Sequence, residues 1–422
     1  MALIASCSSS SSDPADGSAG AAGGPPKGRT FCGLSGPVDP GIVVPAGFCI
    51  RTFATKKDVT APRVIRFSPS GDVFVTAPRA PTPGGSFGGL GAIVVLPDDN
   101  HDGVSDGPVT YAGGNFGNQS NACEQHDADP TDLSCVHGLA FRDGYVYFTR
   151  RDDVRRFPFN AGDRTAPSAV GEVVVATLGT STKDRFTHTL DASTTGPMYV
   201  SRGRFDAVAC DMSGPIGAVL AIDLGAPLPA TPTVVSQGLR NPMYLRCHPS
   251  TGACFANELS GDNWSGIGGR EKLAVISAGS DWGYPCCVGK GAPSAPGVPT
   301  SVCASVDDAL VSIPLHDTPF GMDFDRGLFP PPYRGAAFIA LHGAFPTWVG
   351  TRLVYVPVDE QGMPVGPTAE FATGWGREAT AKVEGRATDV AFAPDGRLFV
   401  VDDTGSNVWW IAPESLALPD GW

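Results

Sequence analysis

The chain has 422 residues, and charged residues make up 17% of it, fewer than the ~25% of an average soluble domain. Its formal net charge of −13 disfavours nucleic acid and anionic membrane surfaces as partners. No stretch is apolar over the ~18 residues that a membrane-spanning helix needs, so no such helix is predicted.

The first residues predict a lipidated tether. Leu3–Cys7 resembles a bacterial lipobox, in which small residues precede a cysteine that is lipidated after cleavage. Serines 8–12 and a Gly/Ala/Pro stretch follow, a composition typical of flexible linkers. The apolar run before Cys7 is shorter than a signal peptide, so either the start lies upstream or the match is chance, and we favour a lipoprotein. We expect a tether over 1–27 and one folded domain over 28–422, in a periplasmic or surface-exposed lipoprotein of the bacterial cell envelope.

The rest of the chain repeats a phrase of turn residues followed by an aliphatic and aromatic strand. Its copies are Phe67–Val75, Phe141–Tyr147, Leu190–Val200, Cys247–Phe255, Phe329–Phe338 and Phe392–Val400. The spacing of roughly 50 to 80 residues exceeds the ~40 to 50 of common propeller repeats, which indicates inserted loops. One small sheet cannot bury both its faces, so such sheets stack around an axis. The sequence predicts an all-β fold, a six-bladed β-propeller with four-stranded antiparallel blades and extended loops.

The chain contains 11 cysteines, and ten remain if Cys7 carries lipid. Short separations suggest three pairs and leave a group of four to pair among themselves: Cys32 with Cys49, Cys123 with Cys135, Cys247 with Cys254, and then Cys210, Cys286, Cys287 and Cys303. Zinc is the alternative, but no Cys-x-x-Cys spacing occurs. We therefore expect disulfides and an oxidising compartment.

Six fragments, in chain order, resemble the glucose/sorbosone dehydrogenases. They are Pro62-Arg63, Gly238–Pro242, Asp281–Pro285, His316–Gly321, His342-Gly343 and Gly385-Arg386. Members of that family are six-bladed propellers, and the characterised soluble ones use pyrroloquinoline quinone (PQQ). The resemblance extends from about Pro45 to Ile411.

The resemblance implies a catalytic base at His188. In the family, a histidine just before a blade's turn takes the proton of the sugar C1 hydroxyl while hydride passes to the quinone. Imidazole suits this role because its ordinary pKa lies near neutrality. The family usually places an arginine shortly after this histidine, where the present chain has Leu190 and Asp191.

The resemblance also implies residues that bind the cofactor. Arg240 and Asn241 match an Arg-Asn pair that contacts the quinone, and a guanidinium can fork onto its carboxylates. The alternative is that Arg240 only braces a tight turn. Arg386 matches one of two family arginines, while Thr388 stands at the second position. His342 lies closest to the place of a family lysine that reaches the quinone.

Two places are candidates for Ca²⁺. The family holds this ion through backbone carbonyls of a Glu-x-Gly-Pro-like loop, which the chain resembles loosely at Gly261 and Asp262, with Asp in place of Pro. Independently, Asp98, Asn100 and Asp102 alternate before a glycine, as in the first half of an EF-hand loop. The alternative for that segment is a solvated acidic turn.

These features favour a PQQ-dependent dehydrogenase that oxidises a sugar or a related hydroxyl or aldehyde. Because the chain has no haem or flavin motif, its electrons must leave to an external acceptor. One alternative is a non-catalytic surface propeller lipoprotein that binds glycan or protein. A less favoured one is a Ca²⁺-dependent lactonase.

Overall fold

The computed structural model describes most of the chain beyond the predicted tether. The described ranges are 29–34, 36–38, 41–79, 89–114, 129–179, 187–192, 196–204, 210–212, 217–344, 350–377, 382–383 and 385–422. The predicted tether over 1–27, with Cys7, lies outside them.

In the described residues, six sheets of four or five strands form the blades, and two two-stranded sheets accompany them. The first blade comprises β2 (Val64–Phe67), β3 (Val73–Ala77), β4 (Ala92–Leu96) and β5 (Val109–Gly113). The second comprises β6 (Leu139–Arg142), β7 (Tyr145–Thr149), β8 (Val154–Pro158) and β9 (Glu172–Val175). The third comprises β10 (Leu190–Ala192), β11 (Met198–Arg202), β12 (Gly217–Ile222) and β13 (Thr233–Leu239), and β17 (Ser280–Asp281) joins it in parallel.

The last three blades follow the same plan. The fourth comprises β14 (Asn241–Cys247), β15 (Cys254–Leu259), β16 (Arg270–Val275) and β20 (Val311–Pro314). The fifth comprises β21 (Pro319–Phe324), β22 (Ala337–Leu341), β23 (Arg352–Val356) and β24 (Ala369–Ala372). The sixth comprises β27 (Ala387–Phe392), β28 (Leu398–Asp402), β29 (Asn407–Pro413) and β1 (Phe48–Ala54). The smaller elements are β18 (Cys287–Gly289), β19 (Ala292–Pro293), β25 (Gly376–Arg377), β26 (Lys382–Val383), and the 3-10 helices η1 (Phe31–Gly33), η3 (Asp262–Ile267) and η4 (Thr300–Cys303).

Each repeated phrase forms the turn between the first and second strands of a blade, together with the second strand. Gly71 in the first copy and Gly396 in the last have φ of 92° and 94°, a conformation that residues with a Cβ rarely adopt. The glycines therefore permit the tight turn that the phrase predicts. The predicted six-bladed propeller of four-stranded antiparallel blades is confirmed, with β17 as an addition to the third blade.

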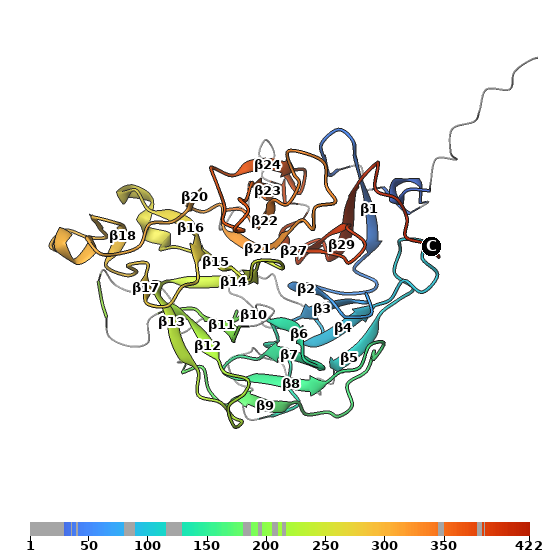
Figure 1. The fold of residues 1–422 in the computed structure, drawn as a ribbon, viewed down its shortest axis with the longest axis horizontal. Helices are drawn as coiled ribbons and strands as arrows, with labels where there is room; N and C mark the ends of the chain where they lie inside the picture. The colour runs from blue at the N-terminus through green and yellow to red at the C-terminus, as the bar shows by residue number, and fades with distance from the viewer. Residues whose placement is uncertain are drawn as a thin grey trace, which may run out of the picture.

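The blades form a closed ring around an axis. Figure 1 shows the first strand of each blade nearest the centre, and each of these inner strands contacts the inner strands of both neighbouring blades. Apolar clusters fill the space between blades: one joins Ile65 and Val75 of the first blade to Val401 and Trp410 of the sixth. Each fully buried aliphatic side chain contributes ~1.5–3 kcal/mol, so the ring is held by interfaces between blades as well as by its sheets.

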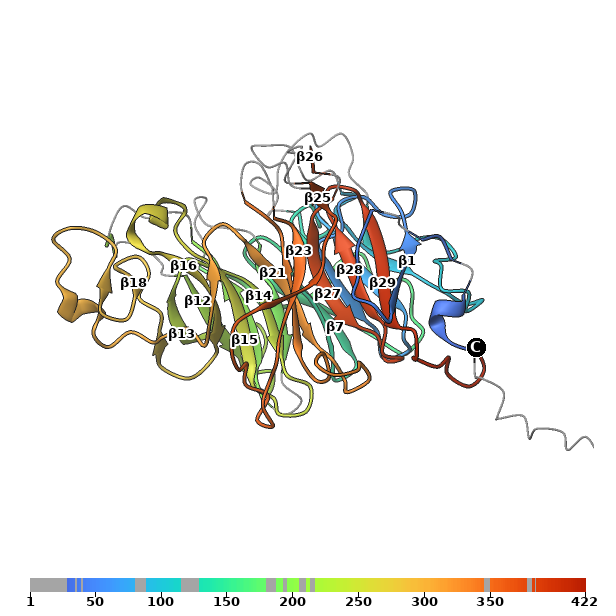
Figure 2. The ribbon, with the colours of Figure 1, turned by 90° about the horizontal axis from the view of Figure 1, so that it is seen from above.

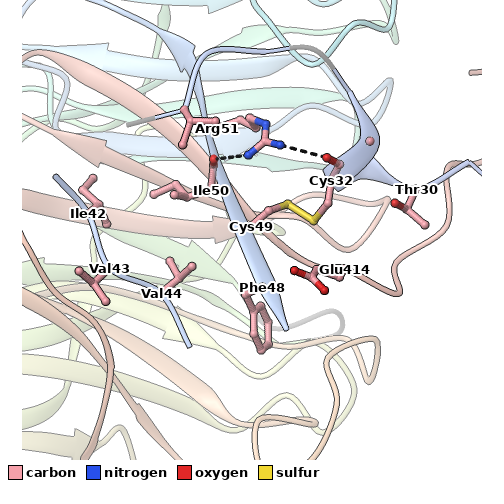
Figure 3. Close-up of a pocket in the computed structure, with 12 residues that line it drawn as sticks. Thr30, Cys32, Ile42, Val43, Val44, Phe48, Cys49, Ile50, Arg51 and Glu414 are labelled. Carbon is pink, nitrogen blue, oxygen red and sulfur yellow. Dashed lines mark hydrogen bonds between the residues drawn. A yellow bond between two sulfur atoms is a disulfide. The ribbon is translucent and has the colours of Figure 1, made fainter. Parts of the chain in front are cut away.

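The N-terminal strand β1 closes the ring by pairing antiparallel with β29, from Phe48 opposite Pro413. A disulfide joins Cys32 to Cys49, and the Arg51 guanidinium donates to the Cys32 carbonyl at 3.0 Å (Figure 3). The pocket of about 790 Å³ drawn there lies along this closing strand. Residues far apart in the chain thus complete one sheet.

The disulfides follow the predicted grouping. Cys32–Cys49 and Cys247–Cys254 form as expected, and the group of four pairs as Cys210–Cys286 and Cys287–Cys303. In the remaining predicted pair, Cys123 lies outside the described residues. Within the described ranges, no helix is both long and apolar enough to cross a membrane.

Candidate active site

Five cationic or imidazole side chains stand where the inner strands begin. Arg63 precedes β2, His137 lies shortly before β6, His188 before β10, Arg240 directly before β14, and Arg386 directly before β27. Every blade starts with its inner strand, so these residues gather at one face of the ring, which we call the axial mouth. The β25–β26 hairpin, which leads into β27, rises from the disc at one face (Figure 2). All five residues are at most 2% exposed.

A buried carboxylate links three residues of the axial mouth. Asp403 follows β28 and bonds Arg63 at 2.6 Å, Arg386 at 3.1 Å and the His342 Nε2 at 3.3 Å. Burial alone would raise the pKa of Asp403, but His342, Arg63 and Arg386 hold it below its usual range. Burial lowers the pKa of His342 to about 3, which Asp403 only partly counters. His342 is therefore neutral at pH 7, and the two arginines balance the carboxylate.

Aromatic rings connect four blades at the same place. Phe320 stacks on His342 with ring centres 4.1 Å apart, and the Arg63 guanidinium lies 4.9 Å from the Phe320 ring centre. Tyr244 also stacks on Phe320, with ring centres 5.6 Å apart, and its hydroxyl donates to the Arg63 carbonyl at 2.8 Å. His137 meets Tyr244 edge-on at 5.4 Å. The first, second, fourth and fifth blades thus converge on the axis through direct side-chain contacts.

His188 is fully buried beside this cluster, and its backbone position is locked. The Thr149 hydroxyl donates to the His188 carbonyl at 2.6 Å, and the Thr189 hydroxyl donates to the Met243 carbonyl at 3.0 Å. Within the described residues, neither ring nitrogen of His188 has a hydrogen-bond partner of good geometry. Burial lowers the pKa of His188 to about 4, although nearby Asp152 acts in the opposite direction. The imidazole is therefore neutral at pH 7.

Arg240 and Asn241 occupy the start of the fourth blade. The Arg240 backbone N–H donates to the Glu258 Oε1 at 3.0 Å, and its guanidinium donates to the Ser260 carbonyl at 2.9 Å and to the Asp262 Oδ2 at 2.8 Å. The Asn241 side-chain Oδ1 is buried with no hydrogen-bond partner among the described residues. Arg240 thus braces its turn, and its guanidinium also reaches a carboxylate.

The loop that follows β15 is held by a buried ion pair. Lys272 Nζ lies 3.0 Å from the Glu258 Oε2, and the Ser260 hydroxyl donates to the same carboxylate at 2.7 Å. The Gly261 carbonyl accepts from the Trp264 N–H at 3.0 Å. The Ser260 and Gly261 carbonyls each already accept one hydrogen bond, so either would bind Ca²⁺ only through its second lone pair.

The segment with alternating oxygens lies after β4, at the opposite end of the first blade from Arg63. The Asp102 N–H donates to Asp98 Oδ1 at 3.1 Å and to Asn100 Oδ1 at 2.9 Å, and the Asn100 amide donates to Asp106 at 2.8 Å. Asp98 Oδ2 is buried without a hydrogen-bond partner in the described part of the chain, and burial raises the pKa of Asp98. No group of three His, Cys, Asp or Glu side chains suited to a metal occurs among the described residues.

Sequence reasoning missed the residues that hold the mouth together. Asp403, Phe320 and Tyr244 were not singled out, and Arg63 was noted only as part of a fragment. The sequence did contain a signal for Arg63, because this residue stands directly before its inner strand, as Arg386 does. Thr388, at the place of a family arginine, donates to the Pro62 carbonyl at 3.2 Å and therefore joins the sixth blade to the first.

The fold and the site define a six-bladed propeller with arginines and neutral histidines buried where the inner strands begin. Within that class, the chain belongs to the glucose/sorbosone dehydrogenase family, whose model matches residues 145–409. This membership makes it an oxidoreductase of the sugar dehydrogenase type.

Solved structures agree on the fold. A Trichoderma reesei enzyme of carbohydrate-active family AA12 is 20% identical with a TM-score of 0.68, over 89% of this chain and 98% of that one. The holo PQQ domain of pyranose dehydrogenase from Coprinopsis cinerea is 16% identical with a TM-score of 0.65, over 89% and 98%. The apo soluble aldose sugar dehydrogenase from Escherichia coli is 16% identical with a TM-score of 0.54, over 87% and 99%. No curated protein sequence matches the chain.

Proposed function

We propose that this protein oxidises a hydroxyl or aldehyde group of a sugar with PQQ as cofactor and His188 as the catalytic base. The observation that carries the proposal is the position of His188, Arg240, Asn241 and Arg386, all at the starts of inner strands around one axial mouth. The resemblance to the glucose/sorbosone dehydrogenases implies that these residues would surround the quinone.

The donor set of the mouth fits a planar quinone with three carboxylates. Buried polar atoms are normally hydrogen-bonded, yet both ring nitrogens of His188 and the Asn241 Oδ1 have no such partner among the described residues. PQQ would supply a partner to Asn241, and the substrate hydroxyl would supply one to His188. Arg240 and Arg386 would hold its anionic groups, and His342 would border it as a neutral ring.

When bound, PQQ supplies a two-electron acceptor for hydride. His188 would take the proton of the substrate hydroxyl on a ring nitrogen, so that the electron pair of the broken O–H bond forms the new carbonyl while the C–H bond of the same carbon breaks and its hydrogen leaves as hydride. The neutral form of the imidazole is the one that accepts a proton, and a pKa of about 4 keeps His188 in this form at pH 7. The electrons then leave to an external acceptor.

We also propose a structural Ca²⁺ site at Asp98, Asn100 and Asp102. The support is the buried Asp98 Oδ2, which has no hydrogen-bond partner in the described residues and is a carboxylate oxygen of the kind that Ca²⁺ prefers. Of the two predicted places, we favour this one over Gly261 and Asp262, because the Asp262 carboxylate is already paired with Arg240. A rise in melting temperature with Ca²⁺ that Asp98→Asn abolishes is expected, and an unchanged wild-type melting curve would contradict the site.

The compartment follows from the cysteines. Four disulfides among the described residues suit an oxidising environment, so we propose a periplasmic or surface-exposed location, with a lipid on Cys7 as the anchor. Metabolic labelling with a radioactive fatty acid, compared between the full chain and Cys7→Ser, tests the anchor.

Reconstitution tests the function. The purified chain is loaded with PQQ and Ca²⁺, and dye reduction is followed with a panel of aldoses. We expect turnover that requires PQQ and that His188→Ala abolishes. Absence of PQQ binding together with absence of turnover would refute the proposal, as would equal activity of His188→Ala and the wild type.

A further inference from the structure

Arg240 and Arg386, the two arginines proposed to bind the cofactor, pair with carboxylates that differ in their exposure to solvent. Arg386 pairs with Asp403, whose side chain is 0% exposed. Arg240 pairs with Asp262 at 2.8 Å, and the Asp262 side chain is 61% exposed while that of Arg240 is 2% exposed. Asp403 is enclosed by its partners, whereas Asp262 reaches Arg240 from solvent.

The rest of Arg240 is fixed without Asp262. Its backbone N–H donates to Glu258, its carbonyl accepts from the Arg204 N–H at 2.6 Å, and its Nη1 donates to the Ser260 carbonyl. The first two contacts fix the Arg240 backbone, and the bond from Nη1 to the Ser260 carbonyl holds the guanidinium itself if Asp262 moves away. Asp262 opens the short 3-10 helix η3 and follows Gly261, a position from which an exposed side chain can rotate into water.

The charges around Arg240 also distinguish Asp262 from the buried Glu258. Glu258 is balanced by Lys272 at 3.0 Å, so this buried pair adds no net charge beside the arginine. Asp262 is the exposed carboxylate bonded to the Arg240 guanidinium, at its Nη2. A ligand carboxylate that binds this edge of Arg240 must therefore displace Asp262 and also approach its negative charge.

We propose that Asp262 is an internal competitor that occupies the place of a ligand carboxylate on Arg240 and thereby lowers the affinity of the axial mouth for an anionic quinone. The inference rests on the proposed function, since it takes PQQ as the ligand of Arg240. When PQQ binds, its carboxylate replaces that of Asp262 on the Arg240 guanidinium. The new ion pair forms at the expense of the old one, so it adds little to the affinity for PQQ.

The expected effect is moderate because exposed ion pairs contribute little to stability. Removing the competing charge should tighten PQQ binding about three- to fivefold. The gain should depend on Arg240 and on the negative charge of the ligand. A merely structural role of Asp262 would instead weaken binding or destabilise the fold.

The experiment measures the Kd of PQQ by isothermal titration calorimetry for the full chain and for Asp262→Asn, which keeps the side-chain size. Asp308→Asn removes the same charge from an exposed position of the segment before β20 and serves as the matched control. The double variant Asp262→Asn/Arg240→Met tests whether the gain acts through Arg240. Phenanthrenequinone, a planar quinone without carboxylates, is the uncharged probe, and melting curves check folding of each variant.

Support for the proposal is tighter PQQ binding by Asp262→Asn alone, an unchanged Kd for Asp308→Asn, no gain in the double variant and no gain for phenanthrenequinone. PQQ binding by the wild type with an equal or higher Kd for Asp262→Asn overturns the proposal and leaves the proposed function standing. Binding by Asp262→Asn without measurable wild-type binding supports both. No PQQ binding by any folded variant overturns both.

Discussion

Replacing Asp403 with Asn should destabilise the protein more than any surface charge substitution. The carboxylate is 0% exposed and bonds Arg63 at 2.6 Å and Arg386 at 3.1 Å, two arginines with side chains 2% exposed. Asn keeps the shape but removes the carboxylate charge that pairs with both buried guanidinium groups. Removing one partner of a buried ion pair typically costs about 3–5 kcal/mol, and the remaining amide oxygen, which still accepts one hydrogen bond, favours the lower end.

Urea denaturation followed by tryptophan fluorescence measures the change in unfolding free energy. The matched control is Glu172→Gln, which breaks the Arg156–Glu172 pair at 2.7 Å, where the Glu172 side chain is 52% exposed. This exposed pair should contribute about 0–1 kcal/mol. Equal losses of unfolding free energy for Asp403→Asn and Glu172→Gln would refute the reasoning that burial makes the Asp403 charge important for stability.

Three further predictions concern catalysis, pH and the disulfides. His188→Ala should lower kcat by about 10²–10⁴-fold without changing the Kd of PQQ measured by calorimetry, and a matching loss of binding would contradict a role confined to proton transfer. Burial lowers the pKa of His342 to about 3 in the folded state. As the pH falls, His342 is therefore protonated in the unfolded chain before it is protonated in the folded one. Its contribution to the unfolding free energy is complete above its ordinary pKa and is lost as the pH falls below that value. Between pH 7 and pH 5 the wild type should therefore lose about 2 kcal/mol more than His342→Gln in urea denaturation, and parallel curves would argue against this burial effect. Replacing Cys210 and Cys286, which are 76 residues apart, with serine should cost about 4 kcal/mol on the chain-entropy model, and an unchanged denaturation midpoint would show that this bridge adds no stability.

The blade architecture could be predicted because its signal is local. In five of the six phrases the structure shows a glycine of positive φ before the second strand, as at Gly71 and Gly396, and six copies of the phrase imply six sheets. The closing strand was not predictable in this way. β1 pairs with β29 across most of the chain length, and nothing in the residues of Phe48–Ala54 identifies that partner.

The candidate site divides in the same manner. His188, Arg240 and Arg386 could be named because each stands next to an inner strand that the repeat predicts. Their partners could not be named. Asp403 and Asp262 are two of 43 acidic residues, and only the folded ring shows that one lies buried between two arginines while the other meets Arg240 from solvent.

The sequence by itself determined the strands, the blade number and the cysteines available for pairing, because turn chemistry and alternation act over a few residues. The tertiary structure decided which charges meet, since residues such as Arg63 and Asp403 are 340 positions apart and become neighbours only when the ring closes. Closure also sets burial, and burial is what makes His188 and His342 neutral and turns one carboxylate into the link between three blades.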